Sequence, residues 1–108
     1  WMLVSAIEVR NINGGYISEN AYRVDRKTPL GNPWKVPPYT REEAISNFRT
    51  YLIDCLKQDT RERIYFEAIL AKARKHNITL LCHCWPKPCH ADVIKELLEQ
   101  RLKNDSSS

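Results

Sequence analysis

A short and mostly apolar run, Ile78–Cys82, lies between two segments with helical hydrophobic spacing, and it restricts the possible folds more than any other part of the sequence. Such a run is typical of a strand that is buried on both faces of a sheet. Because a helical crossover returns the chain parallel to the strand it left, the sequence predicts a small α/β domain. Its short, mostly parallel sheet is expected to be flanked by three helices.

Further strands are expected before the helices. Leu3–Val9 alternates loosely between apolar and polar residues, so it predicts a first strand. Beyond a turn at Asn13–Gly15, short strand pieces are expected at Tyr16–Ile17 and Ala21–Val24. Asp25–Tyr39 holds four prolines and predicts a long irregular loop, which in a compact domain is usually either functional or disordered.

Three helices are indicated by their start signals and by their apolar spacing. Thr40–Glu43 is a capping box, Asp59–Glu62 offers a second helix start, and His90–Lys103 predicts the last helix. The residues expected to face the core are Ile45, Phe48, Leu52, Cys55 and Leu56 in the first helix, Ile64, Tyr65, Ala68, Ile69, Leu70 and Ala71 in the second, and Val93, Ile94, Leu97, Leu98 and Leu102 in the third.

Length and composition narrow the class of protein. The 108 residues predict a single domain, with Met2 as the natural start and with Trp1 and residues 105–108 outside its ordered part. The longest uncharged, apolar-rich stretch, Ile78–Trp85, is far shorter than the roughly 20 residues of a membrane span. There is no secretion signal, and three of the four cysteines are clustered, so we expect a reducing cytoplasm. The net charge of +4 is spread evenly, without the concentrated basic stripe of a dedicated nucleic-acid binder.

The segment Cys82–Asp92, which reads CHCWPKPCHAD, carries most of the chemistry in this sequence. It leaves the carboxyl end of the predicted strand, the edge at which open α/β sheets bind ligands, and enters the last helix. Cys89 and His90 stand at the helix start, where unpaired amides attract anions and stabilise a thiolate, and Lys87 adds positive charge. The segment therefore predicts a site for an anionic group such as a phosphate.

Two alternatives to a ligand site remain open for this segment. Cys82, Cys84, Cys89 and His90 are residue types that bind zinc, but their spacing is not that of a standard zinc finger. Neighbouring residues on a helix also point about 100° apart, which disfavours a single ion shared by positions 89 and 90. No cofactor is therefore favoured, and zinc stays the alternative. Alternatively, the thiols are simply packed, since cysteine often acts as a small hydrophobic residue.

The Gly31–Trp34 turn is the second candidate element. Gly31 permits backbone conformations that are closed to other residues, and Asn32 is held extended because it precedes Pro33. The turn either exposes the Asn32 side chain to a ligand or is a rigid structural turn. Trp34 either stacks on a base or sugar or packs on the core.

Taken together, these motifs resemble the domain of unknown function 4326 family of bacteria and phages. The matching segments are Val9–Asn11, Tyr16–Ser18, Thr28–Trp34, Arg41–Glu42 and Cys82–Asp92. The chain departs from the family pattern at His83, Trp85 and Ala91, and Tyr16–Ser18 lacks the family's Gly and Arg, for which Arg23 or Arg26 is a substitute. The resemblance implies a common fold and a common site, in a family without an established activity.

We therefore expect a cytoplasmic domain of phage or bacterial type that binds a nucleotide-like or other phosphorylated small molecule. Whether it also acts on that molecule is not decided by the residues. The expected roles are a thiolate for Cys89, an acid, base or donor for His90 and an orienting carboxylate for Asp92, with ligand contacts from Asn32, Arg26, Trp34, Cys84 and Lys87. The alternative is a non-enzymatic protein that binds a host protein or nucleic acid and has a structural Cys/His cluster, with or without zinc.

Overall fold

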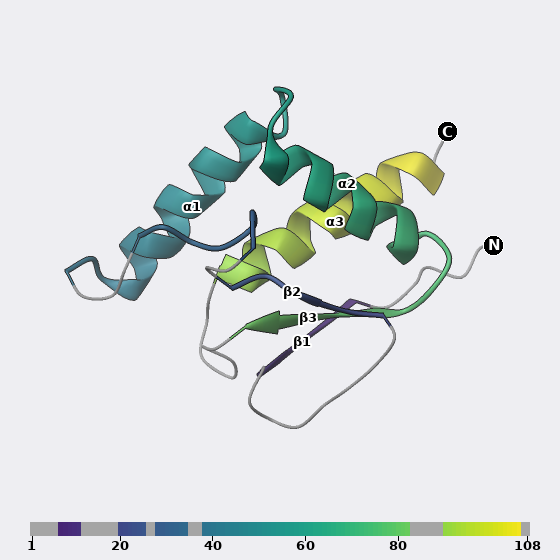
Figure 1. Cartoon of the computed structure of the whole chain (residues 1–108), viewed down its shortest axis with the longest axis horizontal. Coiled ribbons are helices and arrows are strands. Elements are labelled where there is room, and N and C mark those ends of the chain that lie inside the picture. The colour runs from purple at the N-terminus through teal and green to yellow at the C-terminus, as the bar shows by residue number, and fades with distance from the viewer. Residues whose placement is uncertain (1–6, 12–19, 26–27, 35–37, 83–89, 107–108) are drawn as a thin grey trace.

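The computed structural model describes residues 7–11, 20–25, 28–34, 38–82 and 90–106. Three strands, β1 (Ile7–Asn11), β2 (Ala21–Arg23) and β3 (Ile78–Cys82), form one sheet. Three helices, α1 (Arg41–Cys55), α2 (Arg61–Ala73) and α3 (His90–Ser106), lie together on one side of it (Figure 1). The predicted small α/β fold is confirmed.

The sheet has the strand order β1-β3-β2, and both pairs of neighbouring strands are parallel. Parallel pairing requires long crossovers, and α1 and α2 together make the crossover from β2 to β3. The central strand β3 is buried along its length except at Leu81, which is half-buried, as the apolar run predicts. The β1 strand extends to Asn11, two residues past the predicted end, because its pairing with β3 continues as far as Cys82.

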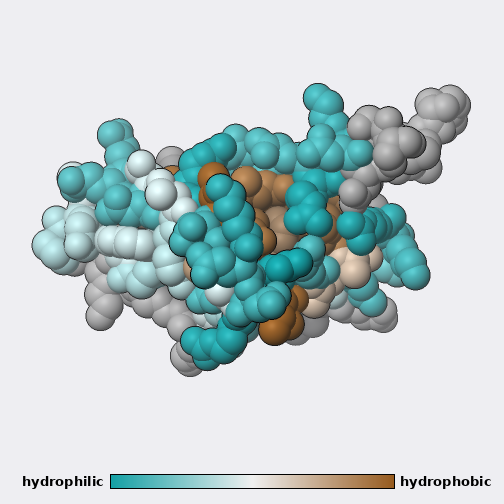
Figure 2. Space-filling view, turned by 90° about the horizontal axis from the view of Figure 1, so that it is seen from above, coloured by the Kyte–Doolittle hydropathy of each residue, from teal (hydrophilic) through white to brown (hydrophobic). Residues whose placement is uncertain are grey.

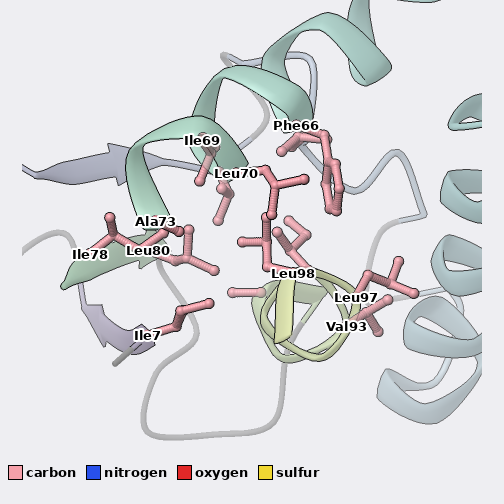
Figure 3. Packing of buried hydrophobic residues seen from close by; sticks show 14 of the residues in the cluster. Ile7, Phe66, Ile69, Leu70, Ala73, Ile78, Leu80, Val93, Leu97 and Leu98 are labelled. Atoms are coloured by element: carbon pink, nitrogen blue, oxygen red, sulfur yellow. The ribbon is translucent and has the colours of Figure 1, made fainter. Parts of the chain in front are cut away.

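The core fills the space between the sheet and the helices. In Figure 3, Ile7, Ile78 and Leu80 point from the strands toward Leu70 of α2 and Leu98 of α3. Burying one such side chain contributes about 1.5–3 kcal/mol. Alternate residues of a strand point to opposite faces of the sheet, so every second strand residue faces the helices and joins this core.

The start of α1 and the inward face of α3 were both predicted correctly. Thr40 caps α1, its side chain accepting from the Glu43 amide while the Glu43 carboxylate accepts from the Thr40 amide. All five predicted core residues of α3 are buried. The α3 helix continues to Ser106, so residues 105 and 106 are helical rather than part of an unstructured tail.

The predicted orientation of α2 was wrong in part. Ile64 has 71% of its surface exposed, and Ala68 and Ala71 are exposed as well. The buried residues are Phe66, Ile69, Leu70 and Ala73, which have the i, i+3, i+4, i+7 spacing of one helix face. The helix is apolar around much of its circumference, so the core selects one of two apolar faces and leaves the other in solvent.

Hydrophilic side chains cover most of the helix-bearing face of the molecule, and hydrophobic surface is visible between them (Figure 2). Among the helices that the structure describes, none combines the length and the apolarity needed to cross a membrane.

Candidate functional site

The carboxyl ends of the three parallel strands meet at one edge of the sheet. The strand register places Asn11 of β1 beside Cys82 of β3, and Arg23 of β2 beside Leu81 of β3. The arrow of β3 points toward the side on which α3 begins (Figure 1). Ligands of open α/β sheets bind outside this edge, so this edge is the candidate site.

The short segment Arg23–Asp25 at this edge is fixed by three other elements. The Val24 amide donates a hydrogen bond to the Leu81 carbonyl of β3, with a nitrogen-to-oxygen distance of 3.0 Å. The Tyr65 hydroxyl of α2 donates to the Arg23 carbonyl at 2.7 Å. The His90 Nε2 of α3 contacts the Val24 carbonyl. A backbone held from three directions presents its side chains in one arrangement, which is what a binding site requires.

An ion pair between a buried carboxylate and a partly exposed guanidinium distinguishes this segment. The Asp25 carboxylate is only 5% exposed, and its Oδ2 lies 2.5 Å from an Nη2 of Arg23, whose side chain is 46% exposed. A buried carboxylate needs a compensating partner, so Asp25 keeps the Arg23 guanidinium at the sheet edge. The outer part of this guanidinium faces solvent and is able to accept an anionic partner.

Tyr65 lies beside this ion pair. Burial, and after it the negative charge of Asp25, raises the pKa of Tyr65 above that of free tyrosine. The phenol therefore stays protonated at neutral pH and continues to donate to Arg23. Its role here is to position the end of β2.

His90, a predicted acid or base, is 8% exposed at the first position of α3. A carbonyl oxygen accepts hydrogen bonds but does not donate them, so the Nε2 that contacts Val24 carries the proton. The imidazole also stands edge-on to Phe48, with the ring centroids 5.1 Å apart. Asp92, its predicted orienting residue, lies exposed in the first turn of α3.

The side chain of Asn32 is turned into the protein. It is 8% exposed, its Nδ2 donates to the Ala44 carbonyl at 3.1 Å, and its Oδ1 accepts from the Trp34 amide at 2.9 Å. The Nδ2 end of the amide thus joins the loop to α1, and the Oδ1 end closes the turn. Of the two roles predicted for Asn32, ligand contact and structural turn, this geometry favours the structural turn.

Trp34 is half-buried and packs against the core. Its ring meets Tyr51 of α1 edge-on, with centroids 5.6 Å apart and an angle of 72° between the rings. The Tyr51 hydroxyl donates to Glu62 of α2 at 2.6 Å, which raises the pKa of Tyr51 and lowers that of Glu62. Packing is therefore the role of Trp34 that its surroundings support.

Four predicted site residues, Arg26, Cys84, Lys87 and Cys89, lie outside the described residues, and their roles stay predictions. Of the predicted zinc ligands, Cys82 is fully buried within the core and His90 uses Nε2 for Val24. Over the residues that the structure describes, no three His, Cys, Asp or Glu side chains gather as a metal site would require.

Cys55 is a core residue, as its place on an apolar helix face predicts. Burial raises the pKa of its thiol, so it has little thiolate character at neutral pH. Neither Cys55 nor Cys82, the two cysteines among the described residues, is part of a disulfide.

Sequence reasoning did not identify Asp25 or Tyr65 as part of the edge, and it considered Arg23 as a substitute for a missing arginine. A signal for Asp25 was present, since an acidic residue directly after a strand and before a long loop is well placed for a sheet-edge site. No comparable signal marks Tyr65, because its contact with Arg23 joins positions 42 residues apart.

Comparison with known proteins assigns the chain to a family. Residues 7–100 match the domain of unknown function DUF4326, so the chain belongs to that family and the predicted resemblance is confirmed. The chain is also similar to an uncharacterized 12.4 kDa protein in the nrdA-td intergenic region of Enterobacteria phage T4. The two are 29% identical over 90 residues, which cover 83% of this chain and 78% of the phage protein. No solved structure matches the chain.

Proposed function

Starting from its membership of the DUF4326 family, we propose that this domain binds a phosphorylated, nucleotide-like small molecule at the carboxyl edge of its sheet. The observation that carries the proposal is the exposed Arg23 guanidinium held by the buried Asp25 carboxylate. The guanidinium has five N–H donors in a planar fork, so it binds a carboxylate on one side and phosphate oxygens on another.

The fixed position of Arg23 favours binding. An arginine that is free in solvent loses side-chain entropy when it binds an anion, at a cost of about 0.5–1.5 kcal/mol. Here Asp25 already restrains the side chain, and Leu81, Tyr65 and His90 restrain the backbone around it. Binding of a phosphate therefore costs less side-chain entropy, and the affinity is higher.

The start of α3 adds to the attraction for anions. His90 places this helix start against Val24, next to the Arg23–Asp25 pair. The first amides of a helix have no partner within the helix, and the helix dipole favours negative charge there. We propose that Cys84, Lys87 and Cys89 contribute to the same site, and that it functions in the cytoplasm.

Isothermal titration of the full chain with AMP, ADP, ribose 5-phosphate and inorganic phosphate tests this proposal. We expect at least one of these compounds to bind and the Arg23→Ala variant to bind it about 10- to 100-fold more weakly, as for a lost hydrogen bond to a charged group. Arg101→Ala is the matched control. Its side chain is 40% exposed and also pairs with a carboxylate, that of Glu67, but it belongs to the far end of α3.

The proposal is wrong if none of the four compounds binds, or if both arginine variants bind like the wild-type chain. In the first case, capture of a host protein or a gel shift with nucleic acid that weakens steeply with salt would support the alternative interaction protein.

A further inference from the structure

The outward face of α2 carries an exposed apolar stripe with a positive charge at each end. Ile64, Ala68 and Ala71 are exposed, and Ile64 has 71% of its surface in solvent. Arg61 precedes them and Lys72 follows them, and both are exposed as well. At about 100° per residue, the five side chains fall within about 100° of the helix circumference. These five residues are called the α2 stripe below.

The α2 stripe has the form of a surface against which another helix packs. Arg61 and Lys72 are about 17 Å apart along the helix axis and within about 20° of each other around it. Between them, the small side chains of Ala68 and Ala71 allow a second helix to approach to the usual distance of about 8–10 Å. Ile64 is the large side chain that such a helix would enclose. Hydrophobic surface between hydrophilic side chains is visible on this side of the molecule (Figure 2).

The two acidic side chains of α2 have partners on the flanks of the helix. Glu62 accepts the hydrogen bond of the Tyr51 hydroxyl, and Glu67 pairs with Arg101 of α3 at 3.1 Å. The pKa of Glu62 is lowered first by this hydrogen bond and also by the positive charge of Arg61. Neither carboxylate belongs to the α2 stripe, so the stripe presents positive charge to a partner.

The charges of the α2 stripe do not suit a second copy of this chain. Two α2 helices packed antiparallel about the centre of the stripe would place Arg61 of one copy beside Lys72 of the other. Packed in parallel, they would place each cation beside its equivalent. Both arrangements bring like charges together, which opposes association. A partner with negative charges at the same spacing is therefore favoured.

Nucleic acid matches only part of the α2 stripe. Its phosphates would pair with Arg61 and Lys72, but they offer no apolar surface to Ile64. An amphipathic helix with Asp or Glu near the ends of its apolar face matches both the apolar centre and the two charges. Such a helix docks through apolar residues that recur every three or four positions.

We infer that the outward face of α2 binds an acidic amphipathic helix of a partner protein. Apolar side chains of that helix pack around Ile64 and over Ala68 and Ala71, and its carboxylates pair with Arg61 and Lys72. These charges set the choice and the orientation of the partner more than the affinity. None of the five residues belongs to the proposed ligand site, so this inference does not depend on the proposed function.

Selection from a random-peptide display library against the full wild-type chain tests the inference. We expect the enriched peptides to combine helically spaced apolar residues with Asp or Glu. The most enriched peptide is then labelled and titrated with the chain, and its fluorescence anisotropy is measured. Ile64→Ala and Lys72→Glu should each weaken its binding by about tenfold, as for the loss of one central contact.

Two controls separate this surface from general stickiness or misfolding. Tyr39→Ala should bind the peptide like the wild type, because Tyr39 is also a large exposed side chain, at 40%, but lies in the loop before α1. A peptide with Lys in place of its acidic residues should not bind the wild-type chain. It should bind the double variant Arg61→Glu, Lys72→Glu, a gain that a damaged fold would not produce.

Several results would overturn the inference. It is wrong if no peptide is enriched, if the enriched peptides lack acidic residues, or if Ile64→Ala binds them like the wild type. Binding of single-stranded oligo(dT) that requires Arg61 and Lys72 but not Ile64 would assign the surface to nucleic acid. Self-association in sedimentation equilibrium that Ile64→Ala weakens would assign it to a second copy.

Discussion

His90 Nε2 donates a hydrogen bond to the backbone carbonyl of Val24, and the two residues are 66 positions apart in the chain. This contact joins the first residue of α3 to the residue that follows β2. It therefore sets where the start of α3 lies relative to the Arg23–Asp25 pair. The proposed site depends on it because an anion bound to Arg23 benefits from the helix start only when the two are close.

Removal of this contact should destabilise the domain. His90→Ala leaves the Val24 carbonyl without this donor at a buried position, which costs about 1–3 kcal/mol in the free energy of unfolding. Urea unfolding followed by circular dichroism measures the loss. The control is His76→Ala, because His76 is exposed after α2 and should change stability by less than about 0.5 kcal/mol. Equal stabilities of the two variants would show that the contact with Val24 contributes nothing.

The hydrogen bond from Tyr51 to Glu62 should make stability depend on pH at both extremes. The pKa of Glu62 is lowered, first by this hydrogen bond, so its stabilising contribution is complete above the ordinary glutamate pKa and is lost as the pH falls through the lowered value. The pKa of Tyr51 is raised, first by the same bond and then by burial. Its contribution is complete below the ordinary tyrosine pKa and is lost as the pH rises through the raised value.

Tyr51→Phe tests this dependence directly. At pH 7 we expect the variant to be less stable than the wild type by about 1 kcal/mol, the typical value of one hydrogen bond. The difference should shrink as the pH falls through the lowered pKa of Glu62, where the carboxylate becomes protonated. Tyr39→Phe serves as the control because Tyr39 is 40% exposed and lies in the loop before α1. A difference that stays constant from pH 3 to pH 7 would argue against the role of the Glu62 charge.

The two apolar faces of α2 should respond differently to substitution. Phe66 is fully buried, so Phe66→Ala should cost about 3–5 kcal/mol in unfolding free energy through lost transfer energy and a cavity. Ile64 is 71% exposed, so Ile64→Ala should stay within about 0.5 kcal/mol of the wild type. Denaturant unfolding of both variants provides the comparison, and a large loss at Ile64 would mean that this face is covered in solution.

The same helix shows how far the sequence determines the fold. The capping box at Thr40 and the inward face of α3 were predictable because their signals are local and each helix has one apolar stripe. The α2 helix has apolar residues on two faces, and local spacing does not select between Ile64 and Phe66. Packing against the sheet and α3 makes that selection.

The candidate site was predictable only in its general place. A strand followed by a Cys/His segment and a helix start indicated the carboxyl edge, and His90 does lie there. The ion pair of Arg23 and Asp25 lies at this edge only because β2, a strand of three residues, pairs with β3. Strand order depends on contacts between distant parts of the chain, and a three-residue pattern has too little periodicity to reveal it.

The purified chain should contain no stoichiometric zinc. A zinc site built from Cys82, Cys84, Cys89 and His90 would need the Cys82 sulfur, which is fully buried in the core, and His90 would have to bind through Nδ1 because Nε2 donates to Val24. Zinc in a structural site binds tightly enough to survive purification, and its removal unfolds a domain that depends on it. Elemental analysis of protein purified without chelator should therefore give well under one zinc per chain, and added EDTA should leave the melting temperature unchanged. About one zinc per chain, together with unfolding by EDTA, would overturn this prediction and identify the Cys/His segment as a structural metal site.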